Sequence, residues 1–480
     1  MKVGARIACW LGGLVLAAVL ASAVVVALFF HKFYPSPPAA DFPPPADVAT
    51  ARQQDFDYLT HYFELNATYS ADAEAEARRL LAGYRARAGA LTGPDFDLAV
   101  SRIVALADNG HSRVDPGPLS RSRSRMPCRL YRFDDGYHII RARAACLELL
   151  GARLVAIDGH SIDDVVDVMY PYFGGPRNHY DQFASVFFLE SPQLLNAAGF
   201  ANAADRLSLH VVMADGSERE VAIVADPPDP DAPHAYSDEY LSPEPLDKEG
   251  PDWRPVLPPD AKLPVALRSY RVPFQSEYWR ESGVYYAQFR SNNDEPGYPI
   301  KTFIHQIENE VRQSKPRIVV VDLRYDQGGN FTTTSSLMSS LTRLSPSIEH
   351  IYAISSAWTF SAGIVSLALL KEHGGSEVTV VGARAGDRTR TWAEGGGMVL
   401  PNSKLSIRFA TGLHDYTRSC FGQPGCFWTM YFFPMHVTTL EPDVQVRYTY
   451  DDYINLRDPS LDRVLALANV AHSGASIVGH

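Results

Sequence analysis

The amino-acid sequence predicts a mixed α/β protein whose largest unit is a mainly parallel β-sheet. Strand and helix patterns alternate over about 263–470, which is typical of repeated strand–helix–strand units. Within this stretch, residues 317–324 contain a continuous apolar run, as expected of a strand covered on both faces. Two expected strands lead into turns that open helices, at 322–330 and 358–363. Because ligands of such sheets bind beyond the carboxyl ends of the strands, these turns are the expected place of a site.

The rest of the chain divides into units of different pattern. A helical domain is expected over 49–120, where Ala, Leu and Arg recur every three or four residues. Residues 121–225 are expected to form a β-rich module. Residues 226–262, which are acidic and rich in proline, are interpreted as an inter-domain linker or surface loop. The α/β core at 263–470 is followed by a tail, 471–480.

The N-terminus predicts export. Lys2 and Arg6 precede an uncharged apolar run, 7–30, which as a helix is about 36 Å long and can cross a bilayer. We therefore expect residues 1–34 to be a membrane anchor, followed by a stiff proline-rich spacer at 35–48. The small residues at 21–23 resemble a signal cleavage site, so a cleaved signal segment is the alternative. Either way, the remainder of the chain is outside the cytoplasm.

Composition and cysteine usage narrow the class of protein. The chain has 480 residues, is 46% hydrophobic and carries a net charge of −11. This describes a globular protein and argues against a nucleic-acid partner, which requires clustered cationic charge. An exported chain permits disulfides, and proximity favours Cys128–Cys146 and Cys420–Cys426 among three possible connectivities. No cysteine or histidine cluster has metal-ligand spacing, so neither a metal nor a cofactor is predicted.

The two turns at the sheet edge carry candidate catalytic groups. Gly328 and Gly329 let the first turn approach a ligand closely and expose backbone N–H groups. Ser361 opens the expected helix of the second turn, where an exposed hydroxyl meets the positive end of the helix. The amides of these glycines and of Ala362 would form an oxyanion hole. Taken alone, a Gly-Gly pair is more often a simple turn, and a serine that opens a helix is more often an N-cap.

Together, these motifs resemble the tail-specific, or C-terminal-processing, serine proteases, including the tricorn core. The resemblance covers about residues 50 to 450 and implies a core of the crotonase/Clp-protease kind, a PDZ-like module at 121–225 and Ser361 as the nucleophile. The segments that match the family's motifs are 108–112, 151–166, 322–330, 360–363, 400–403 and 440–444.

A serine nucleophile needs a base, which the family supplies in two ways. One branch uses a lysine about 25 residues beyond the serine, but residues 382–390 contain arginines and no lysine, and arginine stays protonated. Lys371 and Lys404 lie at other places in the pattern. The tricorn-like branch uses a histidine, and His111 occupies the matching position, with Ser112 beside it to orient the ring or a water.

The third member of a triad is less clearly marked. The family places a glutamate about six residues before the proline of its Pro-Asp element, where this chain has His436. Glu441 is the nearest carboxylate and is the expected orienting acid, and Asp415 is an alternative.

These features predict a serine peptidase of the bacterial inner membrane with its catalytic part in the periplasm, or a secreted or periplasmic enzyme after signal cleavage. Its partners are peptides or unfolded proteins, which the PDZ-like module would dock by strand addition, and the membrane through the N-terminal helix. A catalytically impaired binding protein on the same fold is one alternative. An esterase is another, weakened because Thr359 replaces the first glycine of Gly-x-Ser-x-Gly. The oligomeric state is not predicted.

Overall fold

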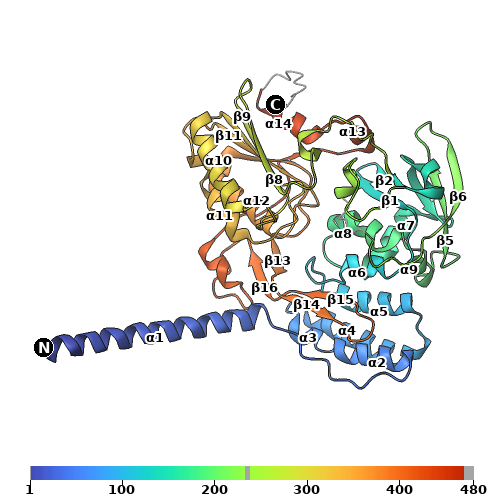
Figure 1. Ribbon diagram of the computed structural model, residues 1–480, viewed down its shortest axis with the longest axis horizontal. Helices are drawn as coiled ribbons and strands as arrows, with labels where there is room; N and C mark the ends of the chain where they lie inside the picture. Colours follow the sequence, from blue (N-terminus) through green and yellow to red (C-terminus); the bar gives the residue numbers. More distant parts are fainter. Residues whose placement is uncertain (1, 233–237, 470–480) are drawn as a thin grey trace.

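The computed structural model describes residues 2–232 and 238–469. Residues 233–237 of the predicted linker and the predicted tail at 471–480 lie outside the described residues. In Figure 1 the N-terminal helix α1 (Lys2–Phe33) extends away from the remaining elements, which pack together.

The core contains a six-stranded sheet with the order β17-β12-β11-β10-β9-β8. All neighbours are parallel except β8, which pairs antiparallel with β9. The mixed α/β class predicted from the sequence is therefore confirmed. The strands are β8 (Phe274–Trp279), β9 (Val284–Phe289), β10 (Ile318–Asp322), β11 (His350–Ser355), β12 (Val378–Gly382) and β17 (Val444–Gln445).

Helices cover both faces of this sheet, as the apolar run in β10 predicts. Val319 and Val321 pack into one hydrophobic cluster, together with apolar residues of α10 (Ile300–Ser314), α11 (Phe331–Ser340) and α12 (Ala362–Gly374). Ile318 and Val320 point to the opposite face and pack with residues of α14 (Pro459–Leu467). Alternate residues of a strand point to opposite faces, so the whole strand is buried.

A second, antiparallel sheet is built from the earlier part of the chain, with the order β1-β2-β3-β5-β6 and with β4 and β7 paired at its side. It shares one hydrophobic core with the N-terminal helices. Part of the proline-rich segment 226–262 packs against this antiparallel sheet. Its strand β7 pairs with β2, and its Glu249 forms a buried ion pair with Arg141. The strands are β1 (Cys128–Phe133), β2 (Gly136–Ala142), β3 (Arg153–Ile157), β4 (His160–Ser161), β5 (Arg206–Val212), β6 (Glu218–Val224) and β7 (Arg254–Pro255).

The remaining elements include further helices and two antiparallel strand pairs, β13 with β16 and β14 with β15. The strands are β13 (Arg390–Ala393), β14 (Gly396–Val399), β15 (Ser406–Phe409) and β16 (Gly412–Asp415). The helices are α2 (Val48–Leu59), α3 (Tyr62–Leu65), α4 (Ala71–Ala86), α5 (Gly93–Ala105), α6 (Pro116–Arg121), α7 (Ile162–Met169), α8 (Arg177–Ala184), α9 (Pro192–Ala197) and α13 (Tyr450–Ile454).

Within the described residues, α1 contains one segment long and apolar enough to cross a membrane, Gly13–Phe33, with a mean hydropathy of 2.8. A signal sequence near the N-terminus also meets this criterion of length and composition. The last turn of the helix is fixed to the core: Phe33 is fully buried, and its carbonyl accepts hydrogen bonds from the Gly395 N–H (3.0 Å) and the Thr411 hydroxyl (2.7 Å). The end of the apolar helix is therefore part of the folded core.

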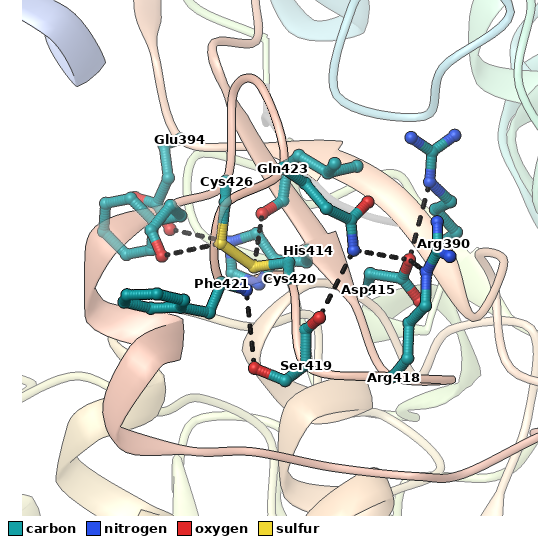
Figure 2. The surroundings of a disulfide bond; sticks show 12 residues. Arg390, Glu394, His414, Asp415, Arg418, Ser419, Cys420, Phe421, Gln423 and Cys426 are labelled. Carbon is teal, nitrogen blue, oxygen red and sulfur yellow. Dashed lines mark hydrogen bonds and ion pairs between the residues drawn. A yellow bond between two sulfur atoms is a disulfide. The ribbon is translucent and has the colours of Figure 1, made fainter.

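Two disulfides are present, Cys128–Cys146 and Cys420–Cys426. They are the two pairings that proximity in the sequence favours. The first lies in the antiparallel sheet unit, and the second closes a small loop after β16, shown with its neighbours in Figure 2.

Candidate active site

Ser361 lies in a strained turn between β11 and α12. Its backbone has φ +51° and ψ −120°, a conformation that costs an L-residue of order 1–3 kcal/mol and persists only where the surroundings enforce it. The turn is tied to the loop after β10: the Thr359 hydroxyl donates to the Leu323 carbonyl (2.7 Å), and the Phe360 N–H donates to the Asp326 carbonyl (2.9 Å). These contacts hold Ser361 at the carboxyl edge of the sheet.

The glycine loop packs directly against Ser361. Gly328 and Gly329 both have positive φ, +108° and +132°. A Cβ atom on Gly328 would lie 2.6 Å from the Cβ of Ser361, and one on Gly329 would lie 2.7 Å from the Asn293 side chain. The pair is therefore needed for close approach as well as for the turn.

The three predicted oxyanion donors are not equivalent. The Gly328 N–H already donates to a carboxylate oxygen of Asp326 (3.0 Å). Among the described residues, no hydrogen-bond acceptor is found for the Gly329 N–H, and Ala362, as the first residue of α12, has no intrahelical acceptor. Gly329, Ser361 and Ala362 line the same small cavity. The amides of Gly329 and Ala362 are thus the ones left to bind a developing oxyanion.

Asp326 holds the two turns together. Its carboxylate is fully buried and accepts hydrogen bonds from the Asn292 amide (2.6 and 2.8 Å) and from Gly328. Burial raises the pKa of Asp326 to about 7. The role of this carboxylate is positional, because its backbone and side chain together fix the loops on which Ser361 and the donor amides lie.

Gly328→Ala is expected to damage the site more than the fold. The added methyl group meets Ser361 and also forces an L-residue to positive φ, which should lower the free energy of unfolding by about 1–3 kcal/mol. Displacement of Ser361 by about 1 Å should lower kcat by about 10²-fold. Thermal unfolding and steady-state kinetics measure both effects. Gly83→Ala is the control, since no atom lies within 4 Å of a Cβ there; equal activity of the two variants would contradict the expectation.

His111 reaches the site on the loop after α5. The Asn109 side chain accepts a hydrogen bond from the His111 N–H (2.9 Å) and so shapes the turn. Gly110 permits close packing, because a Cβ there would lie 2.9 Å from the Phe360 ring. The imidazole stacks on Phe360 with ring centroids 4.4 Å apart. The residue before Ser361 thereby sets the position of the ring.

The His111 side chain is 15% exposed, its two ring nitrogens are buried, and the imidazole faces the same space as the serine. His111 and Ser361 both line a cavity of about 760 Å³. Burial, and then the positive charge of Arg113, keep the pKa of His111 well below its usual range. Within the described residues, neither ring nitrogen has a hydrogen-bond partner. The ring is therefore a neutral acceptor, which is the form that a general base requires.

A carboxylate that the sequence reasoning missed lies next to the ring. Asp387 Oδ2 is 3.8 Å from His111 Nδ1, outside hydrogen-bond length but within ion-pair distance. The carboxylate is buried, accepts hydrogen bonds from the Thr391 hydroxyl (2.7 Å) and the Arg388 N–H (2.8 Å), and has its pKa raised to about 6 by burial. The sequence contains one indication of this residue. Asp387 lies in the segment 382–390, where a catalytic lysine would be expected and none is present.

Other predicted residues are engaged elsewhere. Glu441 is half-exposed and pairs with Arg384 (3.0 Å). In the part of the chain that the structure describes, Glu441 lines neither cavity that contains His111 and Ser361. The Ser112 hydroxyl donates to the Asn66 side chain (3.0 Å) instead of facing the imidazole.

Three further residues considered in the sequence analysis, Asp415, Lys371 and Lys404, also interact with groups other than Ser361 and His111. Asp415 lies beside the Cys420–Cys426 loop, where its carboxylate accepts a hydrogen bond from the Thr417 hydroxyl (2.6 Å) and interacts with Arg390, Arg418 and Gln423 (Figure 2). Lys371 lies 3.7 Å from Asp443, and Lys404 donates to the Pro401 carbonyl (2.6 Å). The geometry accordingly brings together Ser361, His111, Gly329, Ala362 and Asp387.

Comparison with known proteins gives similarity at the level of structure. No protein-family model and no curated protein matches the sequence. Mature CPAF complexed with lactacystin is 12% identical with a TM-score of 0.55, over 88% of this chain and 98% of that chain. Another structure of mature CPAF is 13% identical with a TM-score of 0.55, over 90% and 100%. The photosystem II D1 C-terminal processing protease is 10% identical with a TM-score of 0.37, over 82% and 93%. The chain therefore has the fold of CPAF.

Proposed function

We propose that this protein is an exported serine peptidase that cleaves peptide bonds with Ser361 as nucleophile and His111 as base. The observation that carries the proposal is the shared cavity, which is lined by a serine on a strained turn, a neutral histidine, and two residues, Gly329 and Ala362, whose amides have no acceptor among the described residues. Each group has the state that acyl transfer requires of it.

In the proposed reaction, the Ser361 oxygen attacks the carbonyl carbon while His111 takes the hydroxyl proton. The amides of Gly329 and Ala362 stabilise the oxyanion of the tetrahedral intermediate. When the intermediate collapses, the C–N bond breaks and His111 gives its proton to the leaving amine. Water, deprotonated by the same imidazole, then hydrolyses the acyl-enzyme and restores the serine.

We assign Asp387, rather than Glu441, as the positioning residue for His111. An ionised carboxylate near Nδ1 stabilises the imidazolium that forms in each step. Closure of the gap from 3.8 Å to hydrogen-bond length would accompany substrate binding, since catalytic hydrogen bonds are often long in the absence of substrate. The hydrogen bonds from Thr391 and Arg388 hold the carboxylate in the required orientation.

The wider setting extends the proposal. Residues 13–33 anchor the protein in the inner membrane with the catalytic part in the periplasm, as their length and hydropathy suggest. The antiparallel sheet unit acts as a PDZ-like module on a core of the crotonase/Clp-protease kind, and its edge docks the extended chain of a peptide or unfolded protein.

A fluorophosphonate probe tests the proposal. The wild-type protein should be labelled at Ser361, and the Ser361→Ala variant, with unchanged thermal unfolding, should not be labelled. A folded wild-type protein that never reacts would instead support a binding protein on this fold. Two observations favour this alternative: in the part of the chain that the structure describes, the ring nitrogens of His111 have no hydrogen-bond partner, and Asp387 lies 3.8 Å from the ring. If labelling succeeds, cleavage of an ester but not of the matching amide would identify an esterase.

A further inference from the structure

Two aromatic side chains beside the anchor are unusually exposed. Phe421 and Phe432 are 74% and 80% exposed, the highest values among the large apolar side chains that the structure describes. Phe421 lies in the loop closed by the Cys420–Cys426 disulfide, and Phe432 ends the 3₁₀ helix η9 (Trp428–Phe432). Large apolar side chains that are exposed together on one surface mark a site of contact with a protein or a membrane.

This segment is continuous with the apolar helix α1. The ring of Phe29 lies 6.0 Å from that of Trp428, and the ring of Phe421 lies 4.9 Å from that of Tyr431. The Lys32 ammonium group lies 5.6 Å from the centre of the Trp428 ring. Figure 1 shows the orange-red segment after β16 beside the point where α1 joins the rest of the protein. We call Phe421, Trp428, Tyr431 and Phe432 the aromatic patch.

The length of α1 places the bilayer surface at the level of this patch. Residues 13–33 form 21 residues of apolar helix, about 31 Å long, which matches a hydrocarbon thickness of about 30 Å. The outer boundary of the hydrocarbon then falls near Phe29 and Phe33. Aromatic rings and lysines are the side chains that prefer this boundary. We propose that the aromatic patch inserts into the headgroup region of the bilayer that α1 spans.

The proposal rests on the membrane anchoring put forward above, and it places the catalytic cleft at the membrane. Tyr34, which directly follows α1, donates a 2.5 Å hydrogen bond to Glu394, and both side chains line the cavity that contains Ser361. No free linker separates the anchor from the cleft. Because α1 and the aromatic patch fix two points of the protein on the bilayer, the cleft receives protein segments that lie next to the membrane.

Spin labels on the full-length chain in lipid nanodiscs test the insertion. Cys9, the one cysteine outside the two disulfides, is first replaced by serine. A nitroxide is then attached to Phe432→Cys, to Val19→Cys in α1 and to the control Val224→Cys, which is 60% exposed on β6. We expect collisions with oxygen to dominate over those with a water-soluble nickel chelate at 432 and 19, and the reverse at 224.

Each other outcome overturns the insertion. A water-exposed label at 432 together with a lipid-exposed label at 19 would refute insertion of the aromatic patch and leave the membrane anchor supported. A water-exposed label at 19 would refute both the anchor and the insertion. Spin–spin broadening between copies at 432 would mean that a second copy covers the patch. Fluorophosphonate labelling of the same sample reports Ser361 independently, so failure of the proposed chemistry is seen separately.

Kinetics test the consequence for substrates. Phe421→Ser/Phe432→Ser should lower kcat/KM for a lipid-tethered peptide by about tenfold, because the peptide's effective concentration at the cleft falls, and should leave the same untethered peptide unaffected. The control pair is Leu147→Ser/Val168→Ser, 41% and 44% exposed, neither of which lies on an edge strand of the antiparallel sheet. An unchanged ratio of tethered to free cleavage would contradict the proposal.

Discussion

Replacement of His111 with alanine is expected to lower kcat by roughly 10⁶-fold, as loss of the base does in other serine hydrolases. The physical reason is that Ser361 has no other neutral acceptor assigned to it, and a serine hydroxyl is a poor nucleophile at neutral pH. The fold should persist, because the imidazole makes no hydrogen bond within the described residues. The substitution leaves a cavity beside the Phe360 ring on which the imidazole stacks. Peptide cleavage in the steady state and thermal unfolding measure the two quantities.

Chemical rescue separates catalysis from structure in this variant. Added imidazole should enter the vacated space beside Phe360 and restore part of the activity, which a purely structural histidine would not allow. His414→Ala and His179→Ala are informative comparators, since each ring lines one of the two cavities that contain Ser361. Full activity of His111→Ala together with loss of activity in His414→Ala would transfer the role of base to His414.

Asp387→Asn is expected to lower kcat by about 10⁴-fold, the effect of amidating the carboxylate of a serine triad. Asparagine keeps the shape of the side chain, but its charge no longer stabilises the imidazolium. Burial raises the pKa of Asp387 to about 6, so the carboxylate becomes ionised as the pH rises through that value. Wild-type kcat should therefore rise through about pH 6 and level off above about pH 7, and the variant should lack this step. A pH profile of kcat measures both effects.

Glu441→Gln is the matched control for this substitution. Its carboxylate is half-exposed and paired with Arg384, so the variant should retain the activity and pH profile of the wild type. The opposite result, with Glu441→Gln inactive and Asp387→Asn active, would restore the acid that the sequence pattern indicates.

Much of the fold could be predicted from local sequence patterns, because strands, helices and turns depend mainly on residues that are close together along the chain. The apolar run at 318–321 can be buried only with cover on both sides, and the structure provides it. The strand-to-helix turn of Ser361 and the Gly-Gly turn could likewise be predicted, since glycines and a strand followed at once by a helix leave few backbone geometries.

The environment of the histidine could not be predicted in the same way. His111 and Asp387 are 276 positions apart, and their approach depends on how the N-terminal helices pack against the segment after β12. The family pattern places the acid before the Pro-Asp element, and Glu441 is the nearest carboxylate to that position. Tertiary packing instead places Asp387 beside the His111 ring. Similarly, nothing in the Gly-Gly pattern reveals that Asp326 already occupies the amide of Gly328.

The backbone of Ser361 also limits which nucleophiles this turn can carry. At φ +51°, a β-branched side chain is strongly disfavoured, because its second Cβ substituent meets the backbone. Threonine, often regarded as the mildest exchange for serine, is therefore poorly tolerated in this turn, whereas cysteine fits with the same single γ atom. Over evolutionary time, such a site can exchange oxygen for sulfur in one step but cannot acquire a methyl group without rebuilding the loop.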